Sequence, residues 1–257
     1  MVEGDRFATL RAFTAARIGL GRSGPGIATA DHLAFRTAHA LARDAVHAPL
    51  DLARLEAALR PLGLPVLMVE SEAAGQETHL TRPDLGRRLD AGSAKLLRAA
   101  AQGSDIVVLV AGGLSALATA SHAADLLALL VPGWRRAGRS LGPICIAPRG
   151  RVALGDAVGA LLGARMVLVL IGERPGLSAP DSLGAYLTLA PVPGRTDAER
   201  NCVSNIRPEG MALSEAARRI LWLTDQALTR GLSGVALKDD SDVLAIARSA
   251  GDPAWSA

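Results

Sequence analysis

Glu173 stands where an aliphatic segment of the chain ends and a turn begins. Residues 165–171 are mostly aliphatic, and Arg174, Pro175 and Gly176 follow the glutamate directly. A carboxylate in such a place can accept hydrogen bonds from the amides or hydroxyls of a ligand. An internal ion pair with Arg174 is the structural alternative. Glu173 is therefore a candidate binding residue, with both interpretations open.

The two cysteines differ in their neighbours. Cys145 alternates within an apolar segment and is expected to pack in the core. Cys202 has mainly polar neighbours in the stretch Arg200–Arg207, which we expect to be a loop. Its thiol can face a ligand there, or it can simply pack. As a nucleophile it would need a nearby histidine base, which the sequence neither identifies nor excludes.

The histidines do not form a metal-binding pattern. All of them precede Cys202, and none has a zinc-like spacing with a cysteine. His122 precedes Asp125 by three residues, so the two can share a helix face, but two ligands do not complete a site. We therefore expect surface or helix-capping histidines and no metal site. The histidines are His32, His39, His47, His79 and His122.

Two glycine-rich stretches fail as nucleotide loops. Residues 19–26 follow no hydrophobic strand and precede no Gly-Lys-Ser/Thr, so a connector is expected there rather than a phosphate loop. Residues 112–115 are Gly-Gly-Leu-Ser and do not match the dinucleotide-binding pattern Gly-x-Gly-x-x-Gly. About 20 residues later, where an acidic residue at the end of the next strand would bind the ribose, the sequence has no such residue. A stand-alone nicotinamide oxidoreductase is thus supported only by the general β-turn-α pattern.

The elements that must position these residues alternate between strand and helix after residue 102. Buried strands are expected at 105–111, 143–147 and 165–171, with helices at 114–130 and 154–162 between them. A βαβ order implies right-handed crossovers and parallel strands. Ligands of such sheets bind beyond the carboxyl ends of the strands. Glu173 and residues 112–115 would then lie at one edge.

The fold class predicted is α/β, with a Rossmann-like open, mainly parallel sheet preceded by a mostly helical N-terminal region. We place the helical region at residues 1–101 and the α/β domain at 102–257. Near the end, an amphipathic helix is expected over residues 214–230, stopped by Gly231. Residues 235–237 are interpreted as a final strand.

Composition excludes several classes of protein. An apolar content of 49% in 257 residues is ample for a folded core, and two cysteines cannot build a disulfide framework. The charge of +3 is small and interleaved, and aromatic residues are few, so no nucleic-acid partner is expected. Apolar runs such as 106–111 fall far short of the ~20 residues that span a bilayer. We expect a cytoplasmic protein with no membrane partner.

Several long strings resemble the small subunit of ethanolamine ammonia-lyase. They cover most of the chain, from about residue 7 to residue 238. The strings are Phe13–Arg22, Ala42–His47, Arg82–Arg88, Asp105–Val108, Val169–Ser178, Asp181–Tyr186 and Asp197–Gly210.

The resemblance implies a two-subunit, adenosylcobalamin-dependent enzyme that converts ethanolamine to acetaldehyde and ammonia by a radical mechanism. A large barrel subunit would bind ethanolamine and supply the catalytic side chains, so we assign no catalytic residue to this chain. The family's corrinoid contacts fall on Val152, Glu173 and Cys202. This makes residues 102–257 a corrinoid-binding domain at the interface with the large subunit.

The resemblance leaves two further expectations and one alternative. The chain has no Asp-x-His-x-x-Gly string, so the cofactor should keep its own benzimidazole on cobalt. Some relatives carry a longer N-terminal extension that can direct cargo into a bacterial microcompartment, and no such extension is evident here. The alternative is a noncatalytic corrinoid-binding module that has no lyase partner.

Overall fold

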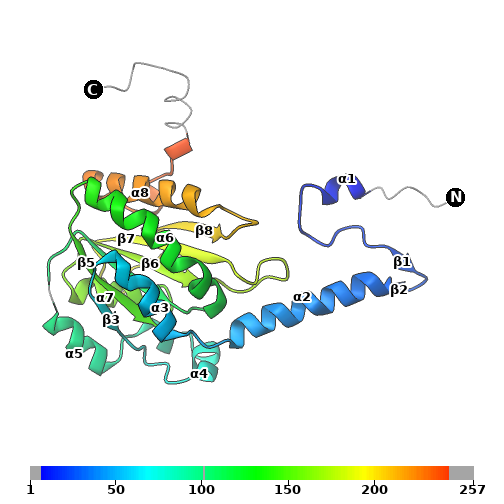
Figure 1. The fold of residues 1–257 in the computed structure, drawn as a ribbon, viewed down its shortest axis with the longest axis horizontal. Helices are drawn as coiled ribbons and strands as arrows, with labels where there is room; N and C mark the ends of the chain where they lie inside the picture. The colour runs from blue at the N-terminus through cyan, green and yellow to red at the C-terminus, as the bar shows by residue number, and fades with distance from the viewer. Residues whose placement is uncertain (1–6, 101, 243–257) are drawn as a thin grey trace, which may run out of the picture.

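The structure, a computed structural model, describes residues 7–100 and 102–242. A six-stranded sheet forms its centre, in the order β3-β5-β4-β6-β7-β8 (Figure 1). The strands are β3 (Val66–Met68), β4 (Ile106–Ala111), β5 (Leu141–Ala147), β6 (Met166–Gly172), β7 (Leu183–Leu189) and β8 (Arg200–Ile206).

The sheet is parallel from β3 to β6 and antiparallel from β6 to β8. Every residue of β4 and β6 is buried, as expected for parallel strands covered by helices on both faces. The predicted α/β class with an open, mainly parallel sheet is therefore confirmed. One edge strand, β3, comes from the part of the chain that we predicted to be mostly helical.

Helices cover the two faces of the sheet unequally (Figure 1). On one face, α3 (Leu52–Leu59), α6 (Ala116–Arg136) and α8 (Leu213–Arg230) pack over all the longer strands, including β7 and β8. On the other face, α5 (Ala91–Ala99) and α7 (Leu154–Leu161) bury alternate residues of β4, β5 and β6. That second core stops at Tyr186 of β7 and does not extend to β8.

The long helix α6 is the most apolar of the covering helices. Among the described residues it alone is long and apolar enough to cross a membrane by length and composition. Its apolar side is instead buried against α8 and the sheet, with Leu126, Leu130 and Trp134 fully or nearly fully enclosed. Ser115 caps its first turn by accepting the amide of Ala118 at 3.2 Å. The apolar composition of α6 is thus explained by its place in the core.

The segment before residue 48 extends away from the sheet (Figure 1). It contains α1 (Ala8–Arg11), the short pair β1 (Arg22–Ser23) and β2 (Gly26–Ile27), and α2 (Thr29–His47). Along the 19 residues of α2, only Ala45 is buried. The helix joins the body at its last turn, where the side-chain amide of Gln76 donates to the carbonyl of Val46 at 2.7 Å.

Shorter elements connect the main ones. They are η1 (Arg60–Leu62), α4 (Gln76–Thr81), η2 (Leu85–Arg87), η3 (Asp197–Glu199) and η4 (Gly234–Ala236). The expected final strand at 235–237 is wrong. Gly234 has φ +71°, and a Cβ on it would lie 2.1 Å from the carbonyl oxygen of Ala198. The segment therefore packs on the chain before β8 instead of joining the sheet.

The turns after β4 and β6 touch through their backbones. Gly113 has φ +61°, and a Cβ there would lie 2.3 Å from the carbonyl oxygen of Gly172. A Cβ on Gly172 would in turn lie 1.9 Å from the carbonyl oxygen of Ser115. Only glycine allows this approach, because any side chain would collide with main-chain atoms that cannot rotate away.

We predict that Gly113→Ala lowers the free energy of unfolding by about 2 to 4 kcal/mol, from the left-handed backbone and the collision together. Urea denaturation followed by circular dichroism measures the loss. Gly138→Ala is the matched control, since Gly138 has φ +68° and a Cβ on it would meet nothing within 4 Å. It should lose only about 1 kcal/mol. Equal losses would mean that the backbone contact contributes nothing.

Candidate functional site

A cavity of about 1390 Å³ opens at the carboxyl ends of the parallel strands. Its floor combines Gly113 and Leu114 after β4, residues 151–153 after β5, and residues 172–174 at and after the end of β6. This is the edge at which open α/β sheets bind ligands. The volume exceeds the ~300 to 1,000 Å³ usual for drug-sized ligands, so the cavity suits a large molecule.

The walls of the cavity differ in character. One wall is apolar and contains Val152, Leu161, Ile171 and the alanines of α7. Another part of the lining is formed by Tyr186 of β7 and by residues 193–197. This hollow exists because the second apolar core ends at β7. Charged side chains from α5 and from the chain around η2 complete the rim.

The structure brings two of the three predicted site residues into the cavity. Val152 and Glu173 both line it, one after β5 and the other after β6. Cys202 does not line it, but it is the cross-strand partner of Tyr186, which does. The expected loop around Cys202 is wrong, because residues 200–206 form β8. Exposed Cys202 and Ser204 flank buried Val203, as on a strand with one open face, and the alternation breaks before Ile206, where the register with β7 shifts.

Glu173 is held by groups of its own chain. Its carboxylate accepts the hydroxyls of Ser182 at 2.5 Å and Ser204 at 2.6 Å, and the backbone amide of Asn205 at 3.2 Å. The ion pair with Arg174 considered from the sequence is not among the contacts of the described residues. Glu173 therefore joins the end of β6 to β7 and β8, while still facing the cavity.

Tyr186, Cys202 and Glu173 form one electrostatic group. Burial, assisted by the nearby Cys202 and Glu173, raises the pKa of the Tyr186 phenol. Although Cys202 is an exposed residue, desolvation of its thiol raises the pKa of that group; the hydrogen bond with Tyr186 opposes this shift and Glu173 adds to it. A thiol with a raised pKa is protonated at neutral pH. Cys202 is thus a neutral polar contact rather than an activated nucleophile.

His79 fixes the first turn of the floor from below. The residue is completely buried, and its Nε2 lies 2.8 Å from the carbonyl oxygen of Gly113. Because a carbonyl can only accept, Nε2 carries the proton in this contact. Arg151 ties the same region together, donating its side chain to the carbonyl of His79 at 2.7 Å and its amide to Gly86 at 2.8 Å.

Arg200 and Asp156 form a buried ion pair behind the cavity wall. The two guanidinium nitrogens meet the two carboxylate oxygens at 2.6 and 2.7 Å, and the side chains are 2% and 0% exposed. Arg200 also donates to the hydroxyl of Thr188 at 2.9 Å and to the carbonyl of Arg195 at 2.7 Å. These contacts connect β8, β7, α7 and the chain between the last two strands.

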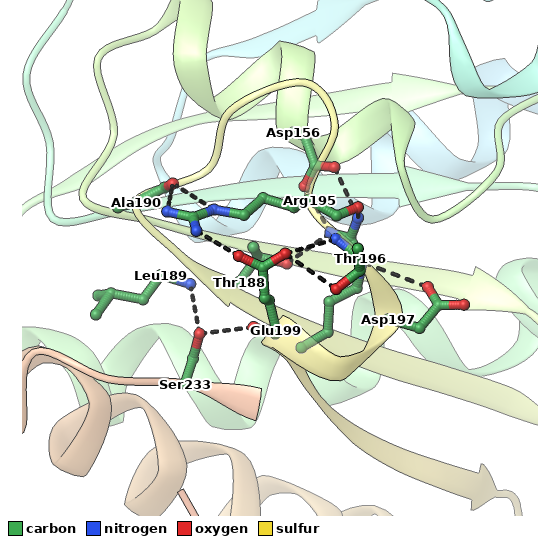
Figure 2. A network of polar contacts seen from close by, with 10 residues as sticks. Asp156, Thr188, Leu189, Ala190, Arg195, Thr196, Asp197, Glu199 and Ser233 are labelled. Carbon is green, nitrogen blue, oxygen red and sulfur yellow. Dashed lines mark hydrogen bonds and ion pairs between the residues drawn. The ribbon is translucent and has the colours of Figure 1, made fainter. Parts of the chain in front are cut away.

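Figure 2 shows the polar network of that connecting chain. Glu199 accepts the amide and hydroxyl of Thr196 at 2.7 and 3.0 Å, closing a capping box on η3. Arg195 pairs with Glu199 at 2.5 Å and donates to the carbonyl of Ala190 at 3.0 Å (Figure 2). These hydrogen bonds brace the wall formed by residues 193–197.

No three metal-ligating side chains converge anywhere in residues 7–100 and 102–242. No histidine of this part of the chain lines the cavity either. The cavity thus offers apolar surface, hydroxyls, carboxylates and guanidinium groups. Its residues can bind and orient a large ligand, and they show no nucleophile paired with a base.

Sequence reasoning missed Tyr186 and the Arg200–Asp156 pair. Leu183–Leu189 was not predicted to be a strand, so the cross-strand pairing of Tyr186 with Cys202 could not be predicted either. The apolar alternation of Leu183, Ala185 and Leu187 was the available signal. Nothing in the spacing of Asp156 and Arg200 indicates contact, since they lie 44 residues apart.

The fold and the cavity define an open α/β protein with a large cavity at the carboxyl ends of its parallel strands. Comparison with known proteins identifies the family. The family model described as ethanolamine ammonia-lyase light chain (EutC) matches residues 4–238. The chain belongs to this family. It is therefore a component of a lyase.

Curated relatives agree over almost the whole chain. The ethanolamine ammonia-lyase small subunit of Bradyrhizobium diazoefficiens is 55% identical over 234 residues, covering 90% of each chain. That of Ralstonia nicotianae is 54% identical over 238 residues, covering 91% of this chain and 88% of the relative. That of Azotobacter vinelandii is 52% identical over 238 residues, with the same coverage of 91% and 88%. Family membership sets aside the stand-alone oxidoreductase.

Removing one partner of the buried pair should be costly. We predict that Asp156→Ala lowers the free energy of unfolding by about 3 to 5 kcal/mol, because Arg200 is left charged and buried. Urea titration of the single variant and of Asp156→Ala/Arg200→Met checks this. The double variant should recover part of the loss. A single-variant loss below about 1 kcal/mol would show that the pair does not hold the wall.

His79 should make stability depend on pH. Burial lowers its pKa below the ordinary 6.5, with smaller contributions from Arg151 and Arg149, while the Gly113 hydrogen bond opposes the shift. The unfolded chain then binds the proton more readily, so the stabilisation present above about pH 6.5 is lost as the pH falls toward the folded-state pKa. Wild type should therefore lose more stability than His79→Gln between about pH 7.5 and about pH 5.5. If the free energy of unfolding changed with pH by the same amount in the two proteins, this prediction would be contradicted.

Proposed function

We propose that this chain is the small subunit of an adenosylcobalamin-dependent ethanolamine ammonia-lyase, which converts ethanolamine to acetaldehyde and ammonia, and that its cavity holds one side of the corrinoid. The observation that carries the proposal is the 1390 Å³ cavity at the strand ends, lined by Val152 and Glu173. Family membership and the names of the relatives support it.

The residues of the cavity fit such a group. A corrin ring is a broad, largely apolar surface fringed by amide arms. Val152, Leu161 and Ile171 offer apolar contact to the ring, and hydroxyls and carboxylates around Glu173 and Tyr186 can meet the amides. Cys202 is the cross-strand partner of Tyr186 and so lies beside this polar group, and we propose that its thiol contacts the same ligand.

A bound adenosylcobalamin would supply the radical chemistry through its cobalt–carbon bond. This chain's own residues contribute binding, orientation and exclusion of water. The floor at Gly113 and Gly172, which His79 supports through its hydrogen bond to the Gly113 carbonyl, positions the ligand, and the wall at 193–197 shields one of its sides. Because no histidine lines the described part of the cavity, we propose that benzimidazole remains the lower cobalt ligand.

The relatives are named small subunits, and a small subunit implies a large one. We propose a hetero-oligomer in which a large barrel subunit binds ethanolamine, supplies the catalytic side chains and closes the open side of the cavity. We further propose that the complex works in the cytoplasm. Packaging in a bacterial microcompartment stays an open alternative.

The central experiment is co-expression with the large subunit, followed by an ethanolamine deamination assay with and without adenosylcobalamin. Deamination that requires both subunits and the cofactor is expected. Corrinoid binding by the complex without deamination would favour the noncatalytic module instead. If the complex neither bound corrinoid nor deaminated ethanolamine, the proposal would be wrong.

Glu173→Ala should weaken corrinoid retention by ~10- to 100-fold while the subunits stay associated, since hydrogen bonds to a charged group contribute ~1.5 to 3 kcal/mol. Equilibrium dialysis of adenosylcobalamin measures retention, and gel filtration measures association. The control is Glu209→Ala, a carboxylate that pairs with Arg207 and does not line the cavity. Unchanged retention in Glu173→Ala would remove Glu173 from the site.

A further inference from the structure

The cavity contains more positive charge than its acidic residues balance. Three of its arginines have ion-pair partners: Arg88 pairs with Glu72, Arg195 with Glu199, and Arg200 with Asp156. Among the described residues, Arg87, Arg151 and Arg174 line the same cavity with no acidic group within ion-pair distance. Arg98 on α5 also lines it, without an ion pair to any residue of 7–100 or 102–242.

The charges of Arg87 and Arg174 both act on Arg151. Arg87 ends η2, Arg151 follows β5, and Arg174 follows β6, so three separate segments bring them together. Burial lowers the pKa of Arg151, and the charges of Arg87 and Arg174 lower it further. Arg98 is not among the groups that shift Arg151. We call the trio of Arg87, Arg151 and Arg174 the arginine cluster.

The central member of the cluster is also incompletely hydrogen-bonded. One terminal nitrogen of Arg151 donates a hydrogen bond to the carbonyl of His79, but the Nε of Arg151 is buried without a hydrogen-bond partner among the described residues. A buried donor without a partner and three like charges in proximity both cost free energy in the absence of a counter-ion. A bound anion would relieve both costs, because guanidinium groups match the geometry of phosphate and carboxylate oxygens.

The surroundings restrict the kind of anion. The arginine cluster shares its cavity with the apolar wall of Val152, Leu161 and Ile171, so the anionic group should belong to a larger, mostly apolar molecule. In a cobalamin, the phosphodiester of the nucleotide loop is the anionic group and is attached to an apolar macrocycle. We propose that Arg87, Arg151 and Arg174 form the subsite that binds this phosphodiester. The inference rests on the proposed function and adds to it the residues that recognise the nucleotide loop.

The test compares two corrinoids on the complex with the large subunit. Adenosylcobalamin carries the phosphodiester, and adenosylcobinamide lacks the whole nucleotide loop. Arg151→Met and Arg87→Met/Arg174→Met should raise the Kd for adenosylcobalamin by ~10- to 100-fold and leave the Kd for adenosylcobinamide within ~2-fold, as measured by equilibrium dialysis. Arg88→Met is the matched control, because Arg88 lines the same cavity but is paired with Glu72. It should change neither Kd by more than ~3-fold.

A second measurement needs no variant. Inorganic phosphate should compete with adenosylcobalamin and not with adenosylcobinamide, relative to chloride at the same ionic strength. If phosphate competes equally with both, or if the arginine variants weaken both corrinoids alike, the phosphodiester assignment is overturned. A wild-type complex that binds adenosylcobinamide but gains nothing from the nucleotide loop overturns it too. Failure of wild type to bind either corrinoid would instead reject the proposed function itself.

Discussion

The ion pair between Arg200 and Asp156 is the interaction on which the rest of the site depends. Arg200 belongs to an edge strand and Asp156 to a helix on the partly covered face, where the apolar core does not reach β8. Full burial of both charges is tolerable because both carboxylate oxygens of Asp156 accept from the guanidinium of Arg200, which also donates to Thr188 and to the carbonyl of Arg195. Through these contacts one side chain fixes a strand, a helix and the wall between them.

The cavity follows from unequal coverage of the sheet. A helix over β7 and β8 would fill the space with apolar side chains, as α6 and α8 do on the opposite face. Without it, Tyr186 lines the cavity while Cys202 and Ser204 are exposed on β8, so polar residues are acceptable on these strands. Glu173 then serves two purposes, since the hydroxyls of Ser182 and Ser204 hold it in place while it lines the cavity. The carboxylate of Glu173 thus both supports the fold and forms part of the cavity surface.

The sequence was most informative where physical patterns are local. Strands β4, β5 and β6 read as unbroken apolar runs because both of their faces are buried, and the turn residues Val152 and Glu173 could be placed at their ends. Strand β8 was taken for a loop because a strand open on one face carries as many polar residues as a loop. The arginine cluster could not be foreseen, since Arg87, Arg151 and Arg174 meet only through the crossovers of the sheet.

The contact between the turns at Gly113 and Gly172 has a consequence for the thermodynamics of binding. Two backbones that touch with no side chain between them cannot shift separately, so the residues beside them have already lost their conformational entropy when the chain folds. A ligand seated on Leu114, Glu173 and their neighbours meets groups that need little further ordering. Association then costs less than it would on mobile loops, and more of the contact energy appears as affinity.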